Sequence, residues 1–130
     1  MKYKIYTTER LCRNEGVGDY SICGYKDWWE LEVTNTENRK FNKLLIIHEL
    51  IECMLIEENG IEEPAIDKFD REFTGEGEPG ESEDAPYHKE HMKAEFFEKE
   101  LAKEFGVDWE EYCKAIDSII LKHKEKSILW

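Results

Sequence analysis

Basic residues are scarce in this chain of 130 residues, in which 18 Lys and Arg stand against 31 Asp and Glu. The formal net charge is therefore −13 at pH 7 with histidine neutral. A surface this acidic repels phosphate backbones and anionic lipid headgroups, which excludes nucleic-acid binding through a basic patch. Binding of a basic partner protein by this acidic surface stays open.

Long hydrophobic runs are also missing. The longest apolar stretch, residues 44–56, is interrupted by His48, Glu49 and Glu52, so it is too polar to span a membrane. The first residues alternate between polar and apolar types and lack the apolar core of a signal peptide. We therefore expect a cytoplasmic protein.

The common metal and catalytic signatures are absent as well. The four cysteines form no C-x-x-C pair, so their spacing does not support a zinc–thiolate site. The sequence contains no nucleophile elbow, P-loop or glycine-rich dinucleotide motif after a strand. These patterns therefore give no support to a zinc–thiolate, nucleophile-elbow, phosphate-loop or dinucleotide site.

The length predicts a single domain over residues 1–130, with a β-rich part over residues 1–34 and a helical part over residues 35–130. The clearest strand covers residues 29–33, where three large apolar side chains alternate with two glutamates. A second short strand is expected over residues 20–25. One covered and one solvated face indicate a small antiparallel sheet packed on helices.

Beyond the strands the apolar period becomes helical. Thr34 and Glu37 fit a capping box and Gly60 fits a helix end, which predicts a helix of about twenty residues between them. Residues 41–56 are apolar at eleven of sixteen positions, so this helix should be central and buried. A shorter helix, an acidic loop over residues 74–86 and two further helices follow. The expected fold class is α+β and mainly α, with a small N-terminal sheet followed by three to four packed helices.

The informative residues of the central helix are His48, Glu49 and Glu52, which share one face at helical spacing. Leu45 and Ile56 close that face one turn before and one turn after, so the polar group is expected to be buried. Burying an imidazole and two carboxylates costs several kcal/mol each unless they are paired or bind a metal. Two interpretations stay open: a hydrogen-bonded core histidine, or a metal site.

A second histidine pair, His88 and His91, begins the helix after the acidic loop. His91 shares the core-facing side of that helix with Glu98, whereas His88 falls towards the rim. His48, Glu52 and His91 make a His₂Glu ligand set with an open position for water, and His88 is a further candidate ligand. Zn²⁺ is the preferred ion, with Mn²⁺ or Fe²⁺ as alternatives.

The motif His48-Glu49-x-x-Glu52, directly after an amphipathic strand, resembles the strand and H-E-x-x-H helix of the zincin metalloproteases. Glu52 stands where that family has its second histidine. The resemblance implies a metal-dependent hydrolase in which Glu49 is the catalytic general base that activates water.

Five motifs along the chain, taken together, are similar to small uncharacterised proteins encoded by phages and prophages. They are HELIE at residues 48–52, D-x-x-D at 67–70, EPG at 78–80, APYHxxH at 85–91 and FGVDW at 105–109. This resemblance implies a phage origin and hence a location in the host cytoplasm, and it implies no particular activity.

Two functions are therefore expected from the sequence. The first is a small metal-binding protein of phage type, with a zincin-like hydrolase activity. The alternative is a non-catalytic acidic accessory or anti-defence protein that binds a basic host protein and holds at most a structural metal.

Overall fold

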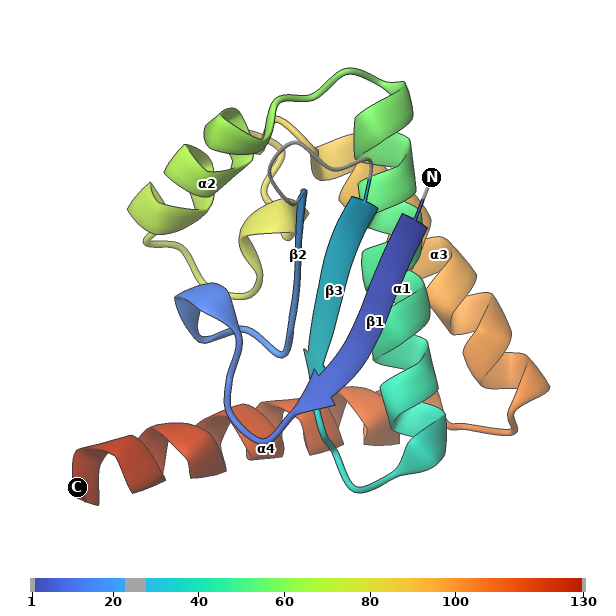
Figure 1. Ribbon diagram of the computed structural model, residues 1–130. Coiled ribbons are helices and arrows are strands. Elements are labelled where there is room, and N and C mark those ends of the chain that lie inside the picture. The colour runs from blue at the N-terminus through green and yellow to red at the C-terminus, as the bar shows by residue number, and fades with distance from the viewer. Residues whose placement is uncertain (1, 23–27, 130) are drawn as a thin grey trace.

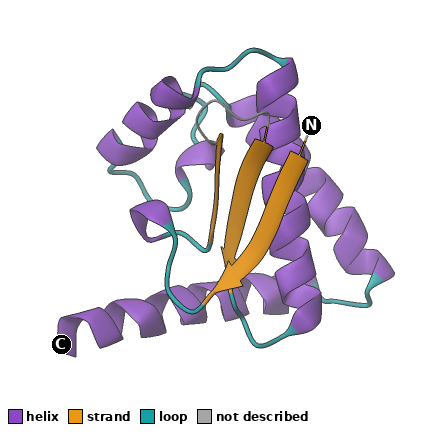
Figure 2. Cartoon of the chain, in the orientation of Figure 1, coloured by secondary structure: helices purple, strands orange, loops and turns teal. Residues whose placement is uncertain are grey.

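The computed structural model describes residues 2–22 and 28–129, with side chains described up to residue 126 (Figures 1 and 2). Three strands come first along the chain and four helices follow, with two short 3₁₀ turns between them. The elements are β1 (Lys2–Thr8), η1 (Arg13–Glu15), β2 (Gly18–Ile22), β3 (Trp28–Thr34), α1 (Arg39–Glu58), α2 (Glu63–Glu72), η2 (Pro79–Glu81), α3 (His88–Glu104) and α4 (Trp109–Leu129). The expected α+β class, mainly helical with a small N-terminal sheet, is confirmed.

The strands form one sheet in the order β1-β3-β2. β2 pairs with β3 antiparallel, but β1 pairs with β3 parallel, so the expectation of a purely antiparallel sheet is wrong for that pair. Alternation along a strand identifies its buried face and carries no information about the direction of its neighbour. The predicted strand over residues 20–25 corresponds to β2, and residues 23–25 lie outside the described part of the chain.

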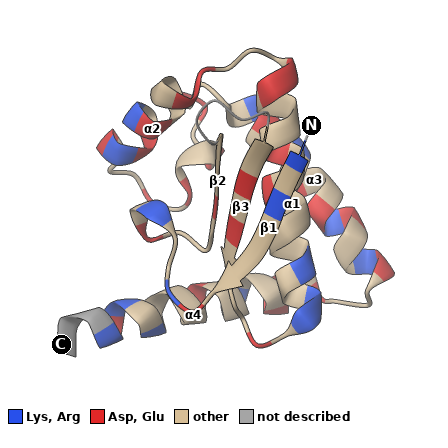
Figure 3. Cartoon of the chain, viewed as in Figure 1, with Lys and Arg blue, Asp and Glu red and all other residues tan. Residues whose placement is uncertain are grey.

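The central strand is β3, whose apolar side chains Trp29, Leu31 and Val33 are all buried. β1 lies at one edge and is mostly exposed. Across this outer face Lys4 lies beside Glu30 of β3, with 3.9 Å between Nζ and Oε1, and Figure 3 shows the basic and acidic positions of the two strands side by side. A pair this exposed adds little to stability.

Helix α1 begins four residues later than the expected capping box. Asn38 is the N-cap, and its side chain accepts a hydrogen bond from the backbone N–H of Phe41 at 3.1 Å. Thr34 is instead the fully buried last residue of β3, and its hydroxyl donates to the carbonyl of Arg10 at 2.9 Å. The capping-box prediction is therefore wrong, because the strand continues through Thr34.

α1 is the central element of the fold, packed against β2 and β3 on one side and against α3 on the other (Figure 1). Two apolar clusters meet it at different heights. One, around Cys53 and Ile56, joins α1 to the sheet and α2, and the other, around Leu44 and Leu45, joins it to α3 and α4. His48 lies between these clusters along the helix, so the fold places it in the interior.

The acidic loop folds back onto α3 through η2, and Gly80 within it is buried. Among the helices in the described ranges 2–22 and 28–129, none is long and apolar enough to cross a lipid bilayer.

Candidate metal centre

The candidate site lies in a cavity of about 490 Å³ whose walls include residues of α1, α3, α4, β2 and the acidic loop. His48 and Glu52, four residues apart on α1, project into it, and His91 of α3 faces them. All three residues are buried, with exposed fractions of 8% for His48, 5% for Glu52 and 4% for His91. Three of the four ligands expected from the sequence are thus brought together.

One atom of each residue meets the other two. Nε2 of His48 lies 3.0 Å from Oε2 of Glu52 and 3.3 Å from Nδ1 of His91, and Nδ1 of His91 lies 3.0 Å from the same oxygen of Glu52. We call these three atoms the donor triangle. All three bear lone pairs when Glu52 is ionised and the inward nitrogens are unprotonated.

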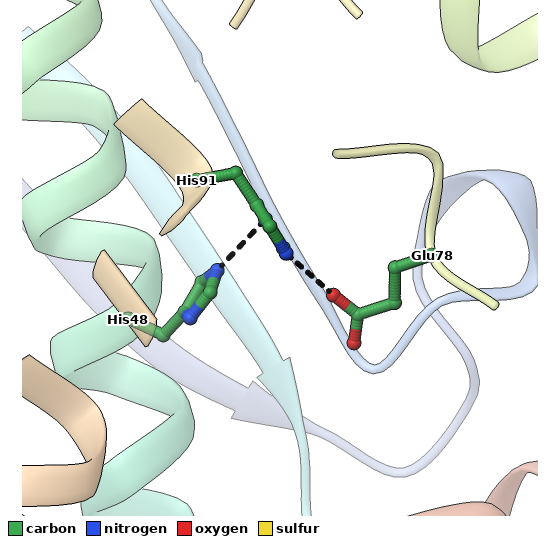
Figure 4. A group of neighbouring side chains, drawn as sticks. All are labelled: His48, Glu78 and His91. Atoms are coloured by element: carbon green, nitrogen blue, oxygen red, sulfur yellow. Dashed lines mark hydrogen bonds and ion pairs between the residues drawn. The ribbon is translucent and has the colours of Figure 1, made fainter. Parts of the chain in front are cut away.

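The outward nitrogen of each imidazole faces another carboxylate. Nδ1 of His48 lies 2.7 Å from Oε1 of Glu98. Nε2 of His91 lies 3.3 Å from Oε2 of Glu78, and Figure 4 shows this second contact. Each carboxylate accepts a hydrogen bond from the outward N–H of the imidazole. The inward nitrogen of the neutral ring is then unprotonated and carries the lone pair. The triangle then presents converging lone pairs, an arrangement that requires a cation, either protons or a metal ion.

The pKa values of His48 and Glu52 are shifted in the directions that favour a positive charge within the triangle. Burial acts against the charged imidazole of His48, but hydrogen bonds with Glu52 and Glu98 raise its pKa well above the usual value. Burial alone would raise the pKa of Glu52, yet hydrogen bonds with His48 and His91 lower it to about 2. In the absence of metal, these contacts therefore favour a protonated imidazole at His48 and an ionised Glu52.

Two tyrosine hydroxyls complete the buried network. Tyr20 of β2 donates to Oε1 of Glu52 at 2.8 Å, and Tyr112 of α4 donates to Oε2 of Glu98 at 2.6 Å. The oxygen of Glu52 that belongs to the triangle is therefore distinct from the oxygen that Tyr20 binds.

Glu49, the expected general base, lines the same cavity next to His48. β2 approaches it closely, since a Cβ added to Gly18 would clash with its Oε1. Burial, and then the charge of Glu52, raises the pKa of Glu49 well above the usual value. Within the described ranges, no hydrogen bond to its carboxyl group is present.

His88 is not brought to the triangle. Its Nδ1 lies 2.9 Å from the carbonyl oxygen of Gly80, and its side chain lines a separate surface hollow. Gly80 itself packs on His91, because a Cβ there would lie 2.5 Å from Cγ of that ring. His88 thus holds the acidic loop against the site.

Glu78 offers a second candidate carboxylate ligand. One donor atom from each of His48, Glu78 and His91 lies within 4.8 Å of the others. The side chain of Glu78 is 60% exposed and comes from the loop, whereas Glu52 is buried on the same helix as His48. Glu52 is therefore the fixed carboxylate and Glu78 the adjustable one.

The cavity walls carry eleven Asp and Glu residues, and Arg13 is their single Lys or Arg within the described part of the chain. Arg13 is already paired with Asp19 at 2.9 Å and with Asp67 at 3.0 Å. Asp70, the other member of the D-x-x-D motif, accepts a hydrogen bond from Tyr87 at 2.6 Å. A cavity with this charge concentrates cations.

Sequence reasoning did not assign roles to Tyr20, Glu78, Glu98 and Tyr112. Glu98 carried a signal, because it shares a helix face with His91. The other three come from separate elements, and no spacing in the sequence links them to His48.

Comparisons of the chain with protein-family models, with curated proteins and with solved structures found no match. Function is therefore inferred from the geometry of the cavity alone.

Proposed function

We propose that this protein binds one divalent metal ion through His48, Glu52 and His91 and acts as a metal-dependent hydrolase. The donor triangle carries the proposal. An ion with ligands at about 2.0–2.1 Å keeps neighbouring donor atoms roughly 2.9–3.3 Å apart, depending on octahedral or tetrahedral geometry. The edges of the triangle are 3.0, 3.0 and 3.3 Å.

Zn²⁺ is the ion that two imidazoles and one carboxylate suit best, and Mn²⁺ or Fe²⁺ would fit the same donors. Bound there, the ion would supply Lewis acidity towards water or a substrate carbonyl. Glu49 would accept the proton from water and deliver it to the leaving group. Its place on the cavity wall beside His48 supports that role, and the raised pKa means that its carboxylate holds an accepted proton more strongly than an ordinary one.

The acidic walls favour neutral or cationic substrates. Eleven carboxylates against one paired arginine repel phosphate esters and other anions. We therefore propose amide or ester bonds of uncharged or basic compounds as the reaction class, in line with the zincin-like motif.

The alternative is a non-catalytic acidic phage accessory protein that binds a basic host protein. One observation favours it: one donor atom each of Glu78, His48 and His91 lie within 4.8 Å of one another, so Glu78 could join Glu52 as a fourth protein ligand by leaving the outward nitrogen of His91. Four protein ligands make a closed, structural metal site without an open position for water.

Under either function, the free thiols of Cys12, Cys53 and Cys113 fit a reducing compartment, and we propose the host cytoplasm.

A single substitution separates the two functions. Glu49→Gln keeps the size of the side chain and removes its basicity, so the metal-loaded variant should retain its ion and lose hydrolysis of a fluorogenic peptide library. Glu58→Gln, an exposed position on the same helix and outside the cavity wall, is the matched control and should retain activity. A metal-loaded wild type inactive on the library would favour the structural alternative. Equal activity in wild type and Glu49→Gln would rule out Glu49 as the base.

A further inference from the structure

We infer that Glu98 and Tyr112 are positioning residues that fix His48 as a metal ligand. The inference rests on the proposed metal site and adds to it two residues from helices other than α1. Neither residue belongs to the donor triangle, so both would act through His48.

The contacts form a chain across three helices. Tyr112 of α4 donates its hydroxyl to Oε2 of Glu98 at 2.6 Å, and Oε1 of Glu98 lies 2.7 Å from Nδ1 of His48. Tyr112, Glu98 and His48 are 2%, 6% and 8% exposed, respectively. Each oxygen of the Glu98 carboxylate has its own hydrogen-bond partner, so the orientation of the carboxylate is fixed.

This arrangement selects the tautomer of His48. With Glu98 ionised, the proton of the neutral imidazole resides on Nδ1 and the lone pair on Nε2, which is the atom in the donor triangle. Without the carboxylate, a proton on Nε2 would be satisfied by Glu52 and would block the lone pair that the ion needs. The negative charge of Glu98 also makes the imidazole a stronger ligand.

A purely structural role would not need a carboxylate at this position. Within the described residues, the ion-pair partner of Glu98 is His48, and burying a carboxylate in such a pair seldom gains stability over an apolar side chain. His91 has a weaker counterpart, because Glu78 approaches its outward nitrogen at 3.3 Å from an exposed loop. The rigid support is thus built on the His48 side of the site.

The test compares the full-length wild type with Glu98→Gln and Tyr112→Phe, and with Glu95→Gln as the control on the same helix. Glu95→Gln removes the same charge one turn earlier, on the same cavity wall. Zn²⁺ affinity is measured by competition with a chromophoric chelator, and the Co²⁺ absorption spectrum is recorded at saturating metal. The spectrum reports the ligand field, which a change in folding stability alone would leave unaltered.

We expect Glu98→Gln to weaken Zn²⁺ binding by about 10- to 100-fold, the usual effect of losing such an outer partner. Tyr112→Phe should weaken it less, and both should shift the Co²⁺ bands, whereas Glu95→Gln should match wild type. Wild-type affinity and spectrum in both variants would overturn the inference and leave the metal site standing. If Glu98→Gln does not fold, Tyr112→Phe alone decides, because it removes a single hydroxyl. A wild type that binds no metal would overturn the proposed function as well, so the two failures are distinguishable.

Discussion

Replacing Gly80 by alanine should disturb the metal centre through a single methyl group. A Cβ at this position would lie 2.5 Å from Cγ and 2.6 Å from Nδ1 of His91. Carbon atoms in contact rest at about 3.5–4.0 Å, so the ring or the loop must move by roughly 1 Å. The carbonyl of Gly80 is tied to His88, which resists movement of the loop. We therefore expect the ring of His91 to yield.

The size of both effects follows from that displacement. Metal–ligand distances tolerate about ±0.2 Å, so moving Nδ1 by roughly 1 Å should cost at least about tenfold in Zn²⁺ affinity. Overpacking in a buried contact costs about 1–3 kcal/mol, which corresponds to a fall in Tm of roughly 4–12 °C for a domain of this size. Chelator competition measures the first effect, and thermal unfolding of the metal-free protein measures the second.

Gly16→Ala is the matched control at another glycine that lines the same cavity. Its Cβ would meet its nearest neighbours at 3.6 and 3.7 Å, an ordinary contact, and its φ of −88° suits alanine. We expect a change within about 0.5 kcal/mol there. Unchanged affinity and Tm in Gly80→Ala would refute the close packing of the loop on His91.

Three further outcomes are expected. Glu52→Gln should reduce Zn²⁺ affinity far more than Glu78→Gln in a chelator competition, because Glu52 is the buried carboxylate; the reverse order would make Glu78 the ligand. In metal-free protein, hydrogen bonds with carboxylates outweigh burial and raise the pKa of His48, so the stability that it contributes is complete below pH about 6.5 and is lost as pH rises through the raised value. The Tm measured in EDTA should therefore fall as the pH rises above 6.5, whereas the Tm of the Zn²⁺-loaded protein should not. A Tm independent of pH in both cases would contradict the protonated triangle. Asn38→Ala should cost about 1 kcal/mol in urea unfolding by removing the α1 cap, and an unchanged midpoint would argue against that cap.

How much of the site could be predicted from sequence depends on which element carries each residue. His48 and Glu52 are four residues apart on one helix, so helical geometry alone places them together. His91 was predicted to face inward because its helix has a clear apolar stripe. Glu78 and Tyr112 reach the site only after the loop and α4 have docked, and no local pattern encodes that docking.

The fold shows the same division. Alternation over residues 29–33 identified the core strand, and the apolar content of residues 41–56 identified the buried helix. The parallel pairing of β1 depends on the path of the chain between strands, which periodicity does not report. The start of α1 was misplaced because Thr34 and Glu37 satisfy a capping pattern that the continuing strand overrides.

The most direct test of the metal centre is anomalous diffraction at the zinc edge from crystals of the Zn²⁺-loaded protein. We expect one peak per chain, about 2.0–2.2 Å from Nε2 of His48, Oε2 of Glu52 and Nδ1 of His91. No peak at these residues after reconstitution would contradict the metal centre and leave a buried, protonated hydrogen-bond network in its place.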